Sequence, residues 1–210
     1  MKQRIPASVT AVLITVALLA SCGPTQHNAP LQTSTSTIKS QEPPHAVSQP
    51  PGISLPDGIT WLSTLDNPAT LHWDDAPSVA RAYIKALYTW DSKVDASDQA
   101  SWVRASIYAT PDLQPSLRHY NPGNSHPSAT YTNSWKHQSY TAVIILDHTR
   151  EGIAHGNADS VTITWRQDTY MRDGFKTIST SGSTYVALAK HQNTWQVSSF
   201  SPALESPDLS

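Results

Sequence analysis

Two strands and the turn between them can be recognised in Tyr185-Val186-Ala187-Leu188-Ala189, His191-Gln192-Asn193 and Thr194-Trp195-Gln196-Val197-Ser198-Ser199-Phe200. The outer runs are rich in β-branched and aromatic residues and the middle run is polar, which is typical of a β-hairpin. Upstream, residues 140–146 are also rich in β-branched residues, and residues 159–169 alternate Val161, Ile163 and Trp165 with polar neighbours. Asp173-Gly174 marks a further turn. We therefore expect an antiparallel meander of about four strands from residue 139 onwards.

Helices are expected before these strands. Asp74-Asp75-Ala76-Pro77 places an acid and a proline where helices begin. The helix should continue to about Trp90, with two adjacent apolar rows. The rows consist of Val79, Tyr83, Leu87 and Trp90, and of Ala80, Ile84 and Tyr88. A helix that is apolar over so wide an arc is expected to lie inside a curved sheet.

A second helix should follow the cap-like residues 95–98. Its inward residues are expected to be Trp102, Val103, Ile107 and Tyr108, and Thr110-Pro111 should end it. Residues 111–119 are expected to form a third, short helix, and residues 121–124 form a turn cluster. No helical period is recognised beyond this point. Helices followed by an antiparallel meander predict the α+β class with segregated layers.

This order resembles the nuclear-transport-factor-2-like superfamily. The closing hairpin, with an apolar strand, a turn and then Trp195 and Val197, is similar to the last hairpin of that family, and residues 80–91 and 102–113 resemble exported actinobacterial members. The resemblance covers about residues 74–202. It implies a cone in which a strongly curved antiparallel sheet wraps a long helix. It also implies that members are often lipoproteins or parts of conjugation systems.

The amino terminus has the features of an export signal. A basic start with Lys2 and Arg4 is followed by an apolar run from Val9 to Ala20. That run is too short to span a bilayer but suits a signal-peptide core. It ends in Leu19-Ala20-Ser21-Cys22, which resembles the bacterial lipobox. Residues 1–21 are therefore predicted to be a lipoprotein signal peptide.

Cys22 is predicted to carry the lipid. Its sulfur would receive a diacylglycerol, which fastens the mature chain to the outer side of the cell membrane. An ordinary secretory signal that happens to end near a cysteine is the alternative. The chain contains one cysteine, so no disulfide is expected within it and the domain must be stable through its core.

The next segment has the composition of a tether. Eight of the sixteen prolines precede residue 57, and Ser, Thr and Gln dominate between them. We expect residues 22–56 to be a disordered or extended stalk, with Ile53 and Leu55 as the residues that could pack on the domain. Residues 57–204 are predicted to be a single domain, and residues 205–210 a tail.

The charge of the mature chain argues against nucleic acid as a partner. Without Lys2 and Arg4, twelve basic residues face sixteen acidic ones, for a net charge of −4. There is no basic run. Nucleic acid and anionic lipid head groups are therefore not expected as partners.

Catalytic candidates follow from the resemblance. Isomerases and dehydratases of this superfamily place an acid, a tyrosine or a histidine inside the cone, where burial shifts its pKa. The candidates are Tyr83, Asp91, Asp147, His148 and Tyr170. A tyrosine on a helix is usually a core residue with its hydroxyl hydrogen-bonded, and Asp147-His148 suits an exposed turn at a strand end. None of the five lies in a spacing that requires catalysis.

Metal and cofactor sites are not expected. No two of the nine histidines are spaced as ligands on one helix face. A pair across strands, such as His148 with His191, remains open as an alternative. Motifs of serine hydrolases, zinc peptidases and nucleotide-binding loops are missing from the sequence.

These patterns favour one function over a rival. We expect a membrane-anchored, extracytoplasmic lipoprotein with a non-catalytic domain that binds a protein or a small ligand, as an envelope, secretion or conjugation component. Trp135, in a polar run, is the tryptophan expected at the surface, where it could serve as a binding residue; the others are spaced like core residues. The rival is a cone-fold isomerase or dehydratase acting on a small apolar substrate.

Overall fold

The computed structural model describes residues 42–119, 128–151, 156–174, 178–201 and 206–207. Four α-helices lie in this part of the chain: α1 (Ala76–Tyr88), α2 (Gln99–Ala105), α3 (Gln114–Leu117) and α4 (Ala129–Lys136). Two 3₁₀ turns accompany them, η1 (Pro68–Thr70) and η2 (Ser106–Tyr108). The strands are β1 (Ala46–Val47), β2 (Trp61–Leu62), β3 (Tyr140–Arg150), β4 (Ala158–Tyr170), β5 (Ile178–His191), β6 (Thr194–Ser201) and β7 (Ser206–Pro207).

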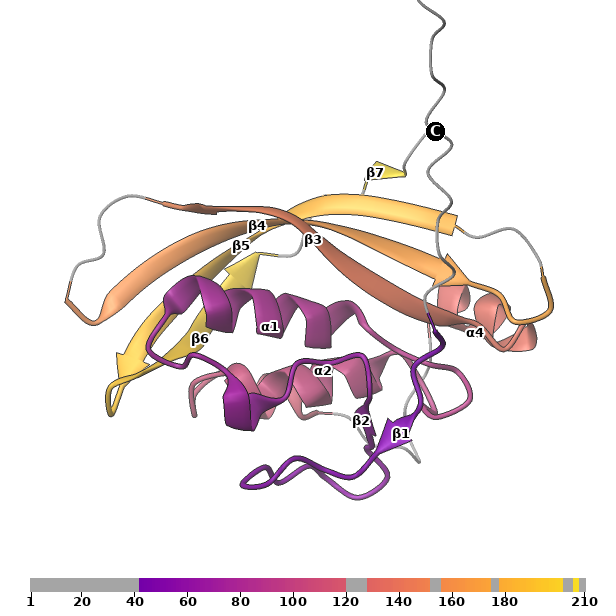
Figure 1. Ribbon diagram of the computed structural model, residues 1–210, viewed down its shortest axis with the longest axis horizontal. Helices are drawn as coiled ribbons and strands as arrows, with labels where there is room; N and C mark the ends of the chain where they lie inside the picture. Colours follow the sequence, from indigo (N-terminus) through magenta and orange to yellow (C-terminus); the bar gives the residue numbers. More distant parts are fainter. Residues whose placement is uncertain (1–41, 120–127, 152–155, 175–177, 202–205, 208–210) are drawn as a thin grey trace, which may run out of the picture. The chain divides into compact units, whose positions relative to one another are not determined.

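The main sheet is an antiparallel meander. Its order is β3-β4-β5-β6, and the short β7 pairs with the first part of β5. Its long strands bend across α1 (Figure 1), and the register shifts between Ile145 and Asp147 and between Ala187 and Leu188. Shifts of this kind increase local twist. The expected α+β class, with helices before a curved sheet of four main strands, is confirmed and is consistent with a nuclear-transport-factor-2-like fold.

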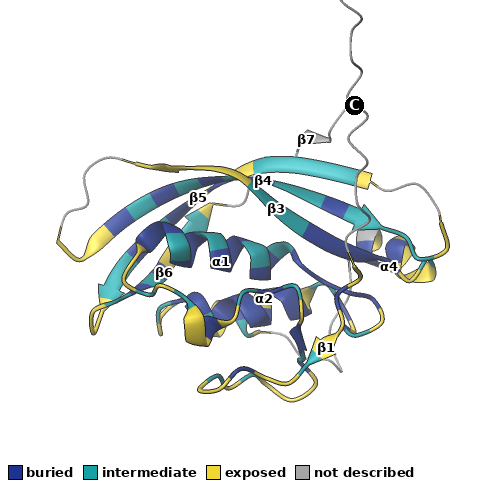
Figure 2. Ribbon diagram, viewed as in Figure 1, coloured by how far each residue is buried: buried dark blue, intermediate teal, exposed yellow. Residues whose placement is uncertain are grey.

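Helix α1 begins where its capping residues predict. The carboxylate of Asp75 accepts a hydrogen bond from the backbone N–H of Ser78 at 2.9 Å, and Pro77 occupies the first turn. The helix ends at Tyr88, two residues before the expected Trp90. It contacts α2 as well as all four main strands. Both predicted apolar rows of α1 therefore pack against other elements, and α1 is buried around most of its circumference (Figure 2).

The core fills the space between α1 and the sheet. Val161, Ile163 and Trp165 of β4 are fully buried, as their alternation predicts. Trp165 stacks on Tyr88 of α1 with ring centroids 4.3 Å apart. Burying one large apolar side chain contributes about 1.5–3 kcal/mol. This row of β4 is therefore a main source of the stability of the domain.

Helix α2 differs from its expected orientation. Val103 and Tyr108 are buried as predicted, but the side chain of Trp102 is 42% exposed. The buried positions of α2 include Ala100 and Val103. Trp102 is two residues from Ala100, about 200° around the helix axis, and so lies on a different side of α2 from this buried residue. The prediction that Trp102 is a core residue is wrong.

Helix α4 was not predicted. It begins after Ser128, whose hydroxyl accepts a hydrogen bond from the backbone N–H of Tyr131 at 3.1 Å. Tyr131 and Ser134 are buried, whereas Trp135 is 58% exposed, as expected. Among the residues of α4 whose burial is described, these two are the buried positions, which are too few to show a helical period. Because α4 is mostly polar, its sequence shows no apolar pattern from which the helix could be predicted.

Part of the expected tether belongs to the folded unit. Strand β1 pairs with β2, with Ala46 opposite Leu62 and Val47 opposite Trp61. Val47 and Leu55 pack against the core. The boundary predicted at residue 57 therefore lies too late in the chain. Residues 1–41, with the predicted signal peptide, Cys22 and most of the tether, lie outside the described residues.

The predicted turns have the backbone torsion angles that tight turns require. Gln192 and Asn193 adopt φ angles of 46° and 70° between β5 and β6, which is typical of a tight hairpin turn. Gly174 has a φ of 84° and donates a backbone hydrogen bond to Met171. The predicted turn at residues 121–124 lies outside the described residues. In the described part of the chain, no helix has the length and apolar character needed to cross a membrane.

Candidate functional site

A groove lies where α1, α2 and α4 meet the sheet. It has a volume of about 370 Å³ and includes residues of β4 and β5 in its wall. A second pocket of about 420 Å³ shares Asp98, Trp102 and Ser128 with it and extends towards α3. Both volumes are within the range of about 300–1,000 Å³ that is usual for small-molecule sites. We call the two pockets together the Trp102 groove.

Trp102 presents an exposed aromatic ring in this groove. Its ring lies 5.9 Å from that of Phe200, at an interplanar angle of 68°. Phe200 in turn lies 5.4 Å from Tyr83 of the core. Edge-to-face pairs at these distances are favourable. The exposed indole of Trp102 is therefore connected to the core through Phe200.

The polar groups of the groove are mostly neutral. The hydroxyl of Ser128 donates to Oδ2 of Asp98 at 2.5 Å, and the hydroxyl of Ser101 donates to the carbonyl of Asp98 at 2.6 Å. The side-chain amide of Gln167 donates to the carbonyl of Tyr88 at 2.6 Å. Thr169 and Thr180 add hydroxyl groups to the wall. Among the described wall residues there is no lysine or arginine; Asp98 is the carboxylate and His119 the histidine among them.

Tyr83 is buried in the core, as its place on the helix predicts. Its side chain is fully buried, and its hydroxyl has no hydrogen-bond partner among the described residues. The expectation that this hydroxyl would be hydrogen-bonded is therefore wrong. Burial, and secondarily the nearby Tyr88, raises the pKa of Tyr83. The phenol stays neutral at physiological pH and lies outside the walls of the Trp102 groove.

Replacing Tyr83 with phenylalanine is expected to leave the fold intact and to raise its stability. A buried donor without a partner costs about 1–3 kcal/mol, and phenylalanine keeps the ring contact with Phe200. Urea unfolding followed by circular dichroism should therefore give a free energy of unfolding equal to or above that of the natural chain. A loss of more than about 1 kcal/mol would contradict the unpaired state of the hydroxyl.

Asp91 belongs to a structural ion pair. Its two carboxylate oxygens lie 2.8 and 2.7 Å from the guanidinium nitrogens of Arg172, and its Oδ1 accepts from the backbone N–H of Lys93 at 2.9 Å. Arg172 also lies over the ring of Tyr140, 4.8 Å from its centroid. With these bonds Asp91 joins the end of the sheet to the loop after α1. It is therefore not a free acid or base.

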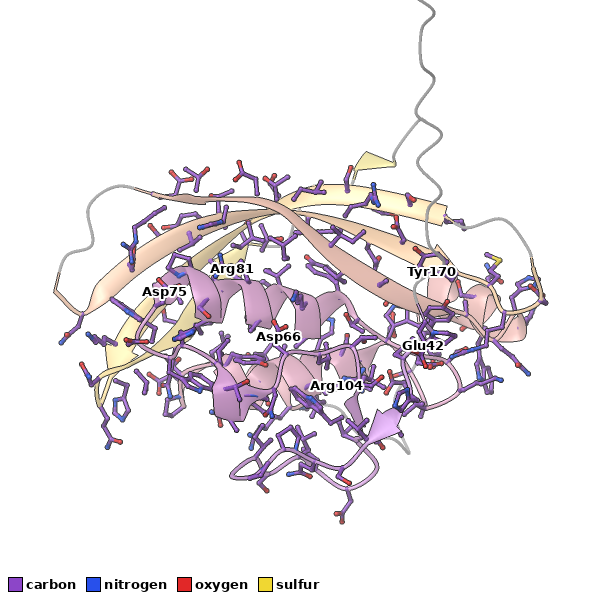
Figure 3. All side chains as sticks on the ribbon, in the orientation of Figure 1. Glu42, Asp66, Asp75, Arg81, Arg104 and Tyr170 are labelled. Atoms are coloured by element: carbon purple, nitrogen blue, oxygen red, sulfur yellow. The ribbon has the colours of Figure 1, made fainter. Side chains whose placement is uncertain are left out.

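Tyr170 lies at the same end of the sheet, near α4 (Figure 3). Its ring stacks on Tyr140 with centroids 5.2 Å apart. Burial, followed by the carboxylate of Asp168, raises the pKa of Tyr170. The structure does not bring it together with Tyr83 or Asp147 in any pocket described above.

Asp147 and His148 are exposed, as expected, but they do not lie in a turn. Strand β3 continues to Arg150, and both residues follow the register shift after Ile145. The backbone N–H of His148 donates to Oδ1 of Asp147 at 2.8 Å. One extra residue at this shift lets β3 stay paired with β4 beyond the position at which the strand was predicted to end. Both side chains point to solvent at an edge strand.

The alternative of a metal held by His148 and His191 is wrong. His148 pairs with Ile163, and Ile163 pairs with Thr184 of β5. His191 is seven residues further along β5 than Thr184, about 23 Å at ~3.3 Å per residue. Zinc needs each histidine nitrogen at about 2.0–2.1 Å. No cluster of three or more His, Cys, Asp or Glu side chains suited to a metal occurs among the described residues.

A second groove lies beside the start of α1 and has different chemistry. Its volume is about 390 Å³, and its cations are Arg81 and Lys85. Lys85 binds Asp66 at 2.9 Å, and Arg81 lies 3.9 Å from Asp75; Figure 3 labels Asp66, Asp75 and Arg81. Among the described residues that line it there is no phenylalanine, tyrosine or tryptophan. Because its cations already have partners, we regard the Trp102 groove as the better candidate.

The sequence singled out none of the residues that build the Trp102 groove as a binding residue. Asp98 was recognised only as a helix cap, and Trp102 was assigned to the core. A test of helical periodicity over the short α2 alone could have predicted that Trp102 is exposed. The convergence of α2, α4 and β5 on one groove has no signal in the sequence, since these elements are far apart along the chain.

Comparisons with known proteins add little about activity. No family model matches this sequence, and no curated protein does. Two chains of solved structures match. One, from Novosphingobium aromaticivorans DSM, is named "putative aromatic ring hydroxylase"; it is 14% identical over 61% of this chain and 91% of its own, with a TM-score of 0.36. A similarity this low gives no information about substrate or reaction.

Proposed function

We propose that the protein is a membrane-anchored, extracytoplasmic lipoprotein whose domain is a non-catalytic binding module. The Trp102 groove is its binding site, and its role is in the cell envelope, as part of a secretion or conjugation assembly or as a carrier of a small ligand. The observation that carries this proposal is the exposed indole of Trp102 in a groove of suitable volume.

The sequence at the amino terminus supports the anchor. Cys22 is the one cysteine of the chain and directly follows Leu19-Ala20-Ser21. The described residues begin at Glu42, so about twenty residues separate Cys22 from the folded unit. At about 3.3 Å per residue such a segment reaches up to ~66 Å. That length is sufficient to hold the groove clear of a bilayer.

The packing of the domain supports a non-catalytic role. In the interior between α1 and the sheet, the side chains of Tyr83 and Trp165 are fully buried in the core. The candidates Asp91 and Tyr170 take part in structural contacts instead. Acid–base catalysis needs titratable groups with contrasting environments in one cavity. The groove contains one carboxylate, which is already hydrogen-bonded to Ser128.

The rival enzyme function rests on a single feature of the groove. Asp98 and His119 line the same pocket, and a carboxylate with a histidine is a common acid–base pair. No hydrogen bond joins these two side chains in the part of the chain that the structure describes. Conversion of a groove ligand by the natural protein, lost in both Asp98→Asn and His119→Ala, would favour the enzyme.

Protection of Trp102 from oxidation tests the binding function directly. Trp102 and Trp135 are 42% and 58% exposed, so both indoles should react with N-bromosuccinimide, and peptide mass spectrometry can separate them. The full chain in mild detergent would be treated with and without a fractionated envelope extract. A ligand at ten times its Kd should slow oxidation of Trp102 about tenfold. Trp135 is the internal control and should react at an unchanged rate.

Three results are informative. Protection of Trp102 by a protein fraction supports an assembly role, and protection by a small-molecule fraction supports a carrier role. If no fraction slows the oxidation of Trp102 relative to Trp135, the groove is not a binding site and the proposal is wrong.

A further inference from the structure

We propose that the ligand of the Trp102 groove is a short, neutral oligosaccharide that stacks on the indole of Trp102. The inference rests on the proposed binding function of the same groove and assigns the chemical class of its ligand.

The first argument is the geometry of the aromatic surface. Trp102 is 42% exposed, whereas Trp90 and Tyr131 of the same groove are 7% and 1% exposed. Tyr88, which also lines the groove, is half-buried. Trp102 is therefore the most exposed tryptophan or tyrosine ring of the groove, and it is held by contact with Phe200 at 5.9 Å. A single flat apolar platform matches the apolar C–H face of a pyranose ring. A quaternary ammonium group would instead need several ring faces around it.

The second argument is charge. The described walls of both pockets contain no lysine or arginine, and they contain the carboxylate of Asp98. A phosphate or carboxylate ligand would meet a like charge at Asp98 without a strong cation to offset it. The groove therefore selects against nucleotides, phospholipid head groups and acidic peptides. A neutral ligand avoids this repulsion.

The third argument is the supply of unused hydrogen-bonding groups. Gln167, Thr169 and Thr180 line the groove, and no hydrogen bond joins Oε1 of Gln167 or the hydroxyl of either threonine to another described residue. All three side chains are half-buried. A purely apolar ligand would cover these groups and leave them unpaired, which costs about 1–3 kcal/mol for each. The hydroxyl groups of a sugar can both donate to and accept from them.

The fourth argument concerns size. The two pockets of about 370 and 420 Å³ adjoin at Trp102, Asp98 and Ser128. A ligand that stacks on Trp102 can therefore extend into a pocket on either side. We infer a chain of two or three sugar rings rather than a monosaccharide.

Direct titration with defined trisaccharides tests the proposal. The full chain in mild detergent would be titrated with maltotriose, cellotriose and tri-N-acetylchitotriose, and with trigalacturonate as the anionic counterpart, by isothermal calorimetry and protection of Trp102 from oxidation. We expect at least one neutral trisaccharide to bind with a Kd of about 1 mM or below, and trigalacturonate not to bind. Trp102→Ala should weaken that binding at least tenfold, Trp102→Phe less, and Thr180→Val by a few-fold. Trp135→Ala, the matched control, should bind as the natural chain does.

The outcomes separate the ligand class from the binding function. If the envelope extract protects Trp102 but none of the neutral trisaccharides binds at about 10 mM, the saccharide assignment is wrong and the binding function stands. If neither the extract nor a trisaccharide protects Trp102, both proposals fail. Equal binding by the natural chain and by folded Trp102→Ala, Trp102→Phe and Thr180→Val would also overturn the assignment, because the sugar would then lie elsewhere.

Discussion

Cys22→Ala is expected to release the protein from the membrane into the soluble extracytoplasmic fraction and to abolish its labelling with radioactive palmitate. The proposed anchor is a set of acyl chains on one sulfur, and each chain contributes about 0.8 kcal/mol per buried methylene. In the described residues no helix is long and apolar enough to cross a membrane. Loss of the single cysteine should therefore remove the whole attachment. Membrane fractionation followed by immunoblotting measures the effect.

Ser21→Ala is the matched control for this experiment. Alanine is also small, so the residue before Cys22 still suits the lipobox, and both labelling and membrane attachment should persist. Mass spectrometry of the natural protein gives an independent check. A chain that retains Met1 and an unmodified thiol at Cys22 would show that the anchor does not exist.

Asp95→Ala is expected to destabilise the domain by about 3–5 kcal/mol. Asp95 binds both guanidinium nitrogens of Arg104, at 2.6 and 2.7 Å, and the two side chains are 1% and 0% exposed. Arg104 also donates to the carbonyls of Thr60 and Thr89, at 3.1 and 3.0 Å. Without Asp95 the guanidinium keeps its charge in a buried place without a counter-ion. Urea unfolding should show the midpoint lowered by about 1 M or more.

Arg81→Ala is the control, because it breaks an exposed ion pair. Arg81 and Asp75 are 37% and 49% exposed and 3.9 Å apart, and such pairs contribute at most about 1 kcal/mol. Figure 3 labels Arg104 as well as Arg81 and Asp75. If Asp95→Ala lowers the midpoint no more than Arg81→Ala does, the buried pair does not have the structural role assigned to it.

The elements that the sequence predicted correctly are those with local signals. Helix α1 has a capping Asp75 and Pro77 in its first turn, and β4 has strict alternation through Trp165. These signals act between residues that are neighbours along the chain. They were sufficient to predict the α+β class, the order of the first three helices and the four main strands, and the burial of Tyr83.

The predictions that failed concern residues whose surroundings come from distant parts of the chain. Trp102 is a large aromatic residue typical of a core, but it lies partly exposed in a groove formed by several elements. Helix α4 is held mainly by Tyr131 and Ser134, too few positions for a period to be visible. His148 and His191 lie on strands that the pairing register holds far apart. In each case the deciding contacts are made by other elements.

The amino-acid sequence alone was enough to establish the class of fold and the order of the first three helices and the four main strands, because capping, periodicity and turn preferences depend on adjacent residues. It also carries the whole case for lipidation at Cys22, which rests on a local motif. The Trp102 groove, the buried pair of Asp95 with Arg104 and the packing of residues 42–56 became visible only in three dimensions. Each depends on segments that are brought together by the burial of apolar surface, which acts between side chains regardless of their separation in sequence.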